Sequence, residues 1–160
     1  MADVGTPEWW LRRLHRQIVE RGPKVDEFTD YYEGEHRLAF ESKRFREAFG
    51  GLFHAFSDNW CGVVVDSVEE RLNPQGLRIG DMPEGDKDAW RIWQENDLDA
   101  GSQLVHSDAL IAGESYVRVW LSDDPVTPEI IPLNACEAVV ENDPKRPRLR
   151  RAGLRIWRDD

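Results

Sequence analysis

The sequence predicts an α+β fold, with helices first and a small antiparallel sheet in the last third of the chain. Two observations support this prediction. Before residue 112, apolar residues recur every three or four positions, as on the buried face of a helix. From Ser115 onward, apolar and polar residues alternate, as in strands with one buried face. Because helices and strands are segregated rather than alternating along the chain, the pattern favours α+β over α/β.

Two short helices are expected at the start of the chain. Thr6-Pro7-Glu8 is a typical helix opening, with a hydroxyl N-cap, proline at the first position and an early acid. Gly22-Pro23 is expected to end this helix, because proline cannot donate to the helical hydrogen-bond ladder. A second helix is expected over residues 24–33, with Gly34 after it in the left-handed conformation.

The strongest helical periodicity lies between Phe45 and Leu72. The glycine pair Gly50-Gly51 predicts a break, followed by a long amphipathic helix from residue 52 to residue 72 that packs its apolar stripe against a core. Asn73-Pro74 is expected to end that helix. The stripe comprises Phe45, Phe49, Leu52, Phe53, Phe56, Trp60, Val63, Val64, Val68 and Leu72.

The rest of the chain is expected to begin with a short strand and a helix pair. The strand is predicted over residues 75–80 and the helices over 86–96 and 99–112, with Asp99 as the second N-cap. A small meander follows, with strands over 116–121, 129–131, 138–141 and 148–158 and a bulge at Gly153. We expect a helical segment 1–74 and an α+β segment 75–160, forming one continuous domain that is truncated at its C-terminal end.

Composition narrows the class of protein. The chain has 160 residues, a net charge of −10 and a pI near 4.9, which opposes non-specific attraction to nucleic acid or an anionic membrane. Cys61 and Cys136 are too few for a disulfide framework, and Cys61 lies in the expected core helix. Neither a signal peptide nor an apolar run of membrane-spanning length is present in the sequence.

No catalytic, metal or cofactor site is predicted. The sequence contains no HExxH, GxSxG, P-loop or GxGxxG motif. Two acidic groups raise the alternative of a metal-dependent hydrolase, but a solvated loop and a solvent-facing helix stripe explain them better. These groups are Asp81, Glu84, Asp86 and Asp88 in one loop, and Asp66, Glu69 and Glu70 on the long helix.

The end of the chain is strongly basic. Seven Lys and Arg residues fall within positions 145–158 of an otherwise acidic protein. Such a patch is able to hold phosphates, to pair with the acidic face of a neighbouring subunit, or to protect an edge strand from aggregation. The candidate contact residues are Arg146, Arg148, Arg150, Arg151 and Arg155.

Six short motifs occur in order over residues 7–158: Tyr31–Leu38 (YYxGxHxL), Asn59–Asp66 (Nxxxx[IV]VD), Arg71–Leu77 (RLxxxG[LF]), Trp93–Asp99 (WxxNx[LF]D), Gly113–Val117 (Gx[SA]Y[VL]) and Ala138–Pro144 ([AV][IV]VxxDP). Their order and spacing resemble those of the portal proteins of tailed bacteriophages of the siphophage type. The motif positions of greatest interest are Tyr31, Tyr32, Gly34, His36, Asn59, Trp60, Asp66, Trp93 and Tyr116.

The resemblance implies a structural role. It predicts a segment of a portal ring subunit, in a dodecamer at one capsid vertex through which double-stranded DNA is packaged and ejected. The matched region is the N-terminal, peripheral wing part of a several-fold longer family, and it carries no catalytic residue. The implied partners are other copies of the subunit, capsid proteins, terminase or head–tail adaptor proteins, and DNA. The implied location is the virion, with the host cytoplasm during assembly. The alternative is a stand-alone binding module whose basic tail holds nucleic acid or an acidic partner.

Overall fold

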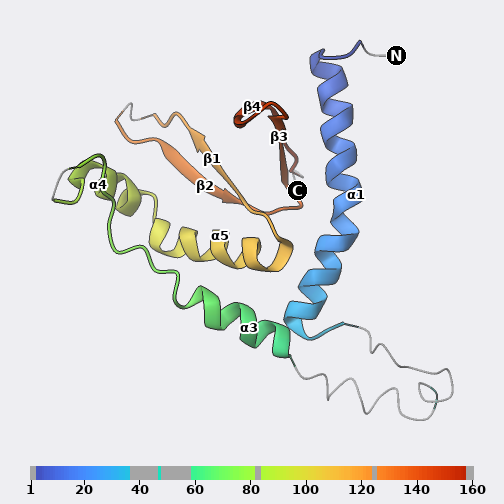
Figure 1. The fold of residues 1–160 in the computed structure, drawn as a ribbon, viewed down its shortest axis with the longest axis horizontal. Helices are drawn as coiled ribbons and strands as arrows, with labels where there is room; N and C mark the ends of the chain where they lie inside the picture. The colour runs from blue at the N-terminus through green and yellow to red at the C-terminus, as the bar shows by residue number, and fades with distance from the viewer. Residues whose placement is uncertain (1–2, 37–46, 48–58, 82–83, 124–125, 158–160) are drawn as a thin grey trace.

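The computed structural model describes residues 3–36, 47, 59–81, 84–123 and 126–157. The long helix α1 (Pro7–Glu33) runs along one side, and α5 (Leu98–Ala112) lies across the middle of the molecule (Figure 1). The remaining helices are α3 (Trp60–Glu69) and α4 (Lys87–Glu95). The strands are β1 (Tyr116–Trp120), β2 (Glu129–Leu133), β3 (Ala138–Asp143) and β4 (Arg146–Arg155). The α+β prediction is confirmed.

Helix α1 is a single helix of 27 residues, so the prediction of two helices split at Gly22-Pro23 is wrong. Its expected ends are correct: the Thr6 side chain accepts from the Trp9 amide, and Gly34 has a φ of 77°. Proline in a helix interior costs about 3 kcal/mol. Packing on both sides of Pro23 offsets this cost, because Leu14 and Ile18 before it and Val25 after it are all buried.

Helix α3 begins at Trp60, where the Asn59 side chain caps it by accepting from the Gly62 amide at 2.8 Å, so the predicted helix is not continuous through Asn59. Its predicted start at residue 52 lies outside the described part of the chain. The expected residues Phe45, Phe49, Leu52, Phe53 and Phe56 lie outside the described part of the chain. The predicted burial of the remaining stripe is wrong: Trp60, Val63, Val64, Val68 and Leu72 are all exposed, Trp60 by 70%. Cys61 is also exposed, not in a core.

The helix pair α4–α5 forms nearly as predicted. Asp86 caps α4 by accepting from the amides of Asp88 and Ala89, and Gly113 ends α5 with a φ of 80°. The N-cap of α5 is Asp97 in the left-handed conformation, so the assignment of Asp99 as N-cap is wrong. Residues 75–80, predicted to be a strand, pair with no other strand among the described residues.

The predicted single meander is instead two separate antiparallel hairpins, β1–β2 and β3–β4. The predicted bulge at Gly153 is also wrong, since Gly153 pairs regularly with Val140. The irregularity lies nearer the tip of β3–β4. There Arg146 and Arg150 pair with the adjacent residues Asp143 and Asn142, so that residues 147–149 loop out of the ladder.

The core is thin. Leu14 and Ile18 of α1 pack on Val139 of β3, and Trp10 and three apolar residues of the β4 region add to this cluster. The buried apolar residues within the described ranges are Leu14, Ile18, Val25, Leu98, Leu133, Ala135, Ala138 and Val139. Many large apolar side chains remain exposed, which is typical of surfaces that pack against another protein. In the described ranges, no helix has both the length and the apolar run needed to span a bilayer.

Candidate functional site: the helix–hairpin junctions and two charged ends

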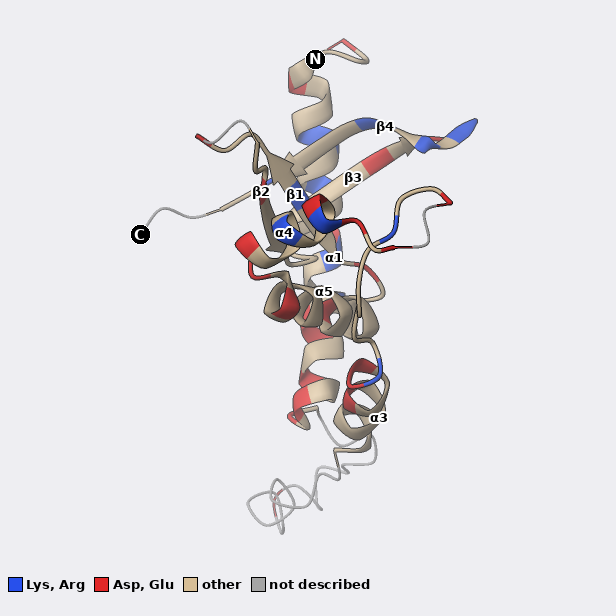
Figure 2. Cartoon of the chain, turned by 90° about the vertical axis from the view of Figure 1, so that its left-hand side faces the viewer, with Lys and Arg blue, Asp and Glu red and all other residues tan. Residues whose placement is uncertain are grey.

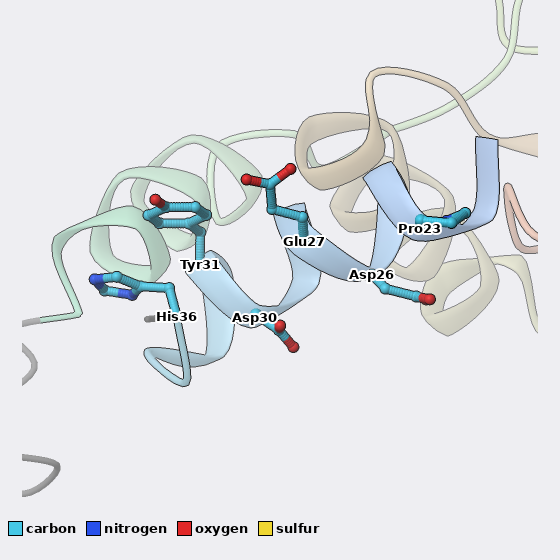
Figure 3. A pocket seen from close by; sticks show the side chains of 6 residues that line it. All are labelled: Pro23, Asp26, Glu27, Asp30, Tyr31 and His36. Carbon is cyan, nitrogen blue, oxygen red and sulfur yellow. The ribbon is translucent and has the colours of Figure 1, made fainter. Parts of the chain in front are cut away.

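Residues 31–36, the described part of the first motif, form the end of α1 and the turn that follows it. The rings of Tyr31 and His36 stack with centroids 4.4 Å apart and planes 13° apart, and Gly34 makes the left-handed turn that allows this return. Three carboxylates precede the stack along the helix, on Asp26, Glu27 and Asp30. Together with Pro23, these residues line a pocket of about 360 Å³, which we name the acidic pocket (Figure 3).

The first and second motifs meet at a hydrogen bond. The Tyr32 hydroxyl donates to Asp66 Oδ1 at 2.9 Å, which joins α1 to α3. Asn59 orients α3 by capping it, and Gly62 fits closely over that cap, since a Cβ at this position would lie 2.6 Å from Asn59 Nδ2. Trp60, by contrast, is exposed and is not among the described residues packed on the core cluster. The Asn59–Asp66 motif therefore docks α3 through its polar residues.

The WxxNxLD motif holds the α4–α5 corner against the first hairpin. Trp93 Nε1 donates to Asp99 Oδ1 at 2.8 Å across the corner. Asn96 reaches β2: its Nδ2 donates to the Pro128 carbonyl at 3.0 Å, and its Oδ1 accepts from the Ile130 amide at 2.8 Å. Leu98 is buried beneath the corner. Each fixed position of the motif thus has a structural contact.

Tyr116 lies at a junction centred on Arg21, a residue that the sequence analysis did not select. Arg21 forms an ion pair with Glu114, and its Nη1 atom lies 3.3 Å from the Tyr116 hydroxyl. Its Nη2 atom donates to the carbonyls of Ala135 and Ala138, the latter at 2.6 Å. The sequence feature that could have identified Arg21 is its spacing from the apolar residues of the helix. Leu14, Ile18, Arg21 and Val25 are four, three and four residues apart, so Arg21 lies on the buried face of α1.

The five candidate arginines of the basic tail separate into two groups. The guanidinium carbons of Arg151 and Arg155 lie over the rings of Trp10 and Trp157, at 5.6 and 5.7 Å from the centroids. Arg146, Arg148 and Arg150 are exposed and take part in no ion pair among the described residues. With Lys145, these three form what we name the basic arm, at the tip of the β3–β4 hairpin (Figure 2).

The acidic residues weighed as metal ligands do not converge in the part of the chain that the structure describes. Within those ranges, no three His, Cys, Asp or Glu side chains are arranged to hold a metal ion. Asp66 is engaged by Tyr32, and Asp86 caps α4. Both have a structural contact of their own.

A comparison with protein families matches residues 13–157 to the family described as "Phage portal protein, SPP1 Gp6-like". The chain belongs to this family. The predicted resemblance is therefore confirmed. The matched range includes all six motifs, and the Tyr32–Asp66 hydrogen bond joins positions of two of these motifs that lie 34 residues apart.

Two related proteins support the assignment. The chain is 36% identical over 124 residues to the portal protein of Mycobacterium phage L5, which is 77% of this chain and 25% of that protein. It is 35% identical over 104 residues to the portal protein of Mycobacterium phage D29, which is 61% of this chain and 20% of that protein. The match with either relative thus spans a quarter or less of that relative's length.

The Tyr32–Asp66 contact leads to a prediction at alkaline pH. The hydrogen bond to Asp66 raises the pKa of Tyr32, and burial raises the pKa of Tyr116. A raised tyrosine pKa means that the folded state favours the neutral phenol. Its contribution to stability is therefore complete below the unfolded pKa of about 10 and is lost as the pH rises through the folded value.

We expect Tyr32→Phe to lower the free energy of unfolding by about 1 kcal/mol at neutral pH. The difference from wild type should shrink as the pH rises through the raised folded pKa of Tyr32, because the wild-type phenol then ionises and no longer donates. Urea unfolding followed by tryptophan fluorescence across this range measures both quantities. Tyr31→Phe is the matched control, because the Tyr31 hydroxyl makes no hydrogen bond among the described residues. An equal loss in both variants would contradict a role for the Tyr32 hydroxyl.

Proposed function

We propose that this chain is a structural segment of a phage portal subunit, in the ring that forms the DNA channel at a capsid vertex. The observation that carries the proposal is the family match over residues 13–157. The portal proteins of phages L5 and D29, both related to this chain, support it. The comparisons favour this function over the alternative of a stand-alone binding module.

The contacts between elements support a structural role. Polar side chains join α1 to α3, α1 to the hairpins, and the α4–α5 corner to β2, through Tyr32, Arg21 and Asn96 respectively. Such contacts fix the relative positions of elements that share little buried apolar surface. A subunit that must present fixed surfaces to its neighbours needs this kind of rigidity.

The exposed apolar residues also support a role in an assembly. The apolar side of α3 is one such surface, and β1 carries another, with Val119 exposed by 62% and Trp120 by 65%. Side chains of this size are enriched where subunits meet. In the ring we expect these surfaces to contact other copies of the subunit or other parts of the same portal protein.

The remaining expectations follow from the same proposal. The segment carries out no catalysis and holds no cofactor. Its partners are other portal subunits, capsid proteins, terminase or adaptor proteins, and the DNA that passes through the ring. It is located at the portal vertex of the virion and in the host cytoplasm during assembly. Its motif residues act by positioning elements, not by reacting.

Grafting tests the proposed function. Residues 13–157 would replace the matched segment of the phage L5 portal protein, and the purified chimera would be imaged by negative-stain electron microscopy. Closed rings like those of the parent protein are expected. A graft carrying Arg21→Met is the control for a poorly folded segment. A chimera that resists proteolysis as the parent does, yet stays monomeric, would contradict the proposal.

A further inference from the structure

We propose that the basic arm of one copy docks in the acidic pocket of a second copy, with Arg146, Arg148 and Arg150 as the contact residues. This inference rests on the proposed function and names one of its interfaces. A ring with cyclic symmetry needs a heterologous contact, in which two different surfaces of each subunit fit each other. The described part of the chain offers two such surfaces with opposite charge.

The charges are segregated along the molecule. Figure 2 shows basic residues at the tip of the β3–β4 hairpin and acidic residues towards the C-terminal end of α1 and on α3. Figures 1 and 2 agree that the hairpin lies towards the N-terminal half of α1, at the opposite end from the acidic pocket. Because these two surfaces are far apart within one copy, they are able to meet only between copies.

The arm projects arginines that have no partner within the described chain. The register shift between Asn142 and Asp143 leaves residues 147–149 of β4 without partners on β3, and Arg148 is exposed there beside the exposed Leu149. The tip itself is held firmly, since Asp143 Oδ1 accepts from the amides of Lys145 and Arg146 at 2.8 and 3.1 Å. A fixed tip with free guanidinium groups loses less conformational entropy on binding than a mobile tail does.

Two other arginines show how this chain binds a guanidinium group. Arg13 forms an ion pair with Glu141 at 2.6 Å and lies 5.4 Å from the Trp9 ring centroid. Arg21 forms an ion pair with Glu114 and lies 5.8 Å from the Tyr116 ring centroid. Each is held by a carboxylate and an aromatic face, a combination that suits the planar, delocalised charge of arginine.

The acidic pocket supplies the same combination without the arginine. It is lined by the carboxylates of Asp26, Glu27 and Asp30 and by the stacked rings of Tyr31 and His36, with Asp26 towards the Pro23 end (Figure 3). None of the three carboxylates takes part in an ion pair among the described residues, and Tyr31 is 37% exposed. The pocket volume of about 360 Å³ is ample for an arginine side chain.

A second copy suits the arm better than nucleic acid does. The net charge of −10 opposes the approach of phosphates and of a second copy alike, but a second copy also offers a carboxylate-lined pocket whose charge the arm neutralises on contact. The arrangement that holds Arg13 and Arg21, with carboxylates and an aromatic ring, is already present in the acidic pocket. Docking of the arm therefore requires no molecule other than a second copy of this chain. Binding of the arm to nucleic acid is the competing outcome of the test.

The test uses two neutralised variants of the chain. The arm variant is R146Q/R148Q/R150Q, and the pocket variant is D26N/E27Q/D30N. The matched control, R71Q/R78Q/K87Q, removes three exposed positive charges elsewhere on the chain. Circular dichroism establishes that each variant is folded. Sedimentation velocity then measures association of each variant alone and of an equimolar mixture of the two, at low and at high salt.

We expect the wild-type chain and the control to associate at low salt and to separate at high salt, because exposed charge pairs are screened. Each variant alone should associate about tenfold more weakly, as expected for losing several exposed pairs. The mixture should form a one-to-one dimer and nothing larger, because each variant keeps the half that the other lacks. This capped dimer is the signature of a heterologous contact.

Three results would overturn the proposal: a wild-type chain that never associates, variants that associate like wild type, or a mixture that stays monomeric. An arm variant that loses binding to duplex DNA but associates normally would assign the arm to nucleic acid instead. The grafting experiment separates this inference from the proposed function. Chimeric rings that still form with the arm variant would reject the interface and retain the portal role.

Discussion

Replacing Arg21 with methionine is expected to lower the free energy of unfolding by about 3 kcal/mol. Methionine keeps the packing of the aliphatic stem on α1 but removes every donor. The Glu114 carboxylate then loses its cation, and the carbonyls of Ala135 and Ala138 lose their donor in a partly buried site. Equilibrium urea unfolding followed by tryptophan fluorescence measures the change.

Two further variants show whether the loss comes from the guanidinium group. Arg21→Lys should recover only part of the stability. A single ammonium group cannot reach the carboxylate and both carbonyls at once, as the planar guanidinium group does with its several N–H donors. Arg16→Met is the matched control, since Arg16 is exposed on the same helix, and its effect should stay within about 0.5 kcal/mol. If Arg21→Met and Arg16→Met cost the same, the junction does not stabilise the fold.

The elements that the sequence predicted well have local signals at their ends. Thr6-Pro7-Glu8, Asp86 and the glycines Gly34 and Gly113 all act in the structure as the sequence indicated. A cap is satisfied by the backbone of its own helix, so its recognition needs no knowledge of the rest of the fold. The runs of β-branched and aromatic residues in β1 and β3 are also local signals, and both strands were predicted from them.

The errors occur where tertiary contacts override a local signal. Helix α1 continues through Pro23 because packing before and after it outweighs the lost hydrogen bond. The periodicity of α3 correctly places Trp60, Val64 and Val68 on one side of the helix. Periodicity states only that residues share a face, and it does not identify what covers that face. In this chain the face is exposed.

The candidate site was only partly accessible to sequence reasoning. The motifs pointed to Tyr32, Asp66 and Asn96, but the pairing of Tyr32 with Asp66 spans 34 residues and required the fold. Arg21 and Glu114 are 93 residues apart and belong to no common motif. The basic arm was recognised from composition. Its division into stacked and free arginines depends on the positions of the Trp10 and Trp157 rings, which alternation alone does not predict.

Asn96 is expected to show the second large effect, because one side chain joins the end of α4 to the start of the first hairpin. Its amide nitrogen donates to the carbonyls of Ile92 and Pro128, and its amide oxygen accepts from the Ile130 backbone. Asn96→Ala removes all three hydrogen bonds and should lower the free energy of unfolding by about 2 kcal/mol. Asn73→Ala is the matched control, since the Asn73 side chain is exposed and makes no hydrogen bond among the described residues.

Asn96→Asp distinguishes the hydrogen-bond role of Asn96 from a role in filling space. Aspartate has nearly the same shape, but at neutral pH it places a carboxylate oxygen against the carbonyls of Ile92 and Pro128, where the amide donated. We therefore expect this variant to be at least as unstable as Asn96→Ala near pH 7.

The carbonyls of Ile92 and Pro128 favour the protonated acid in the folded state, so the pKa of the introduced aspartate should rise above the unfolded value of about 3.9. The deficit relative to wild type should then shrink as the pH falls through the folded pKa, because the protonated acid is again a donor. Urea unfolding of both proteins between neutral and acidic pH measures this, and a deficit that does not change with pH would show that Asn96 acts by shape alone.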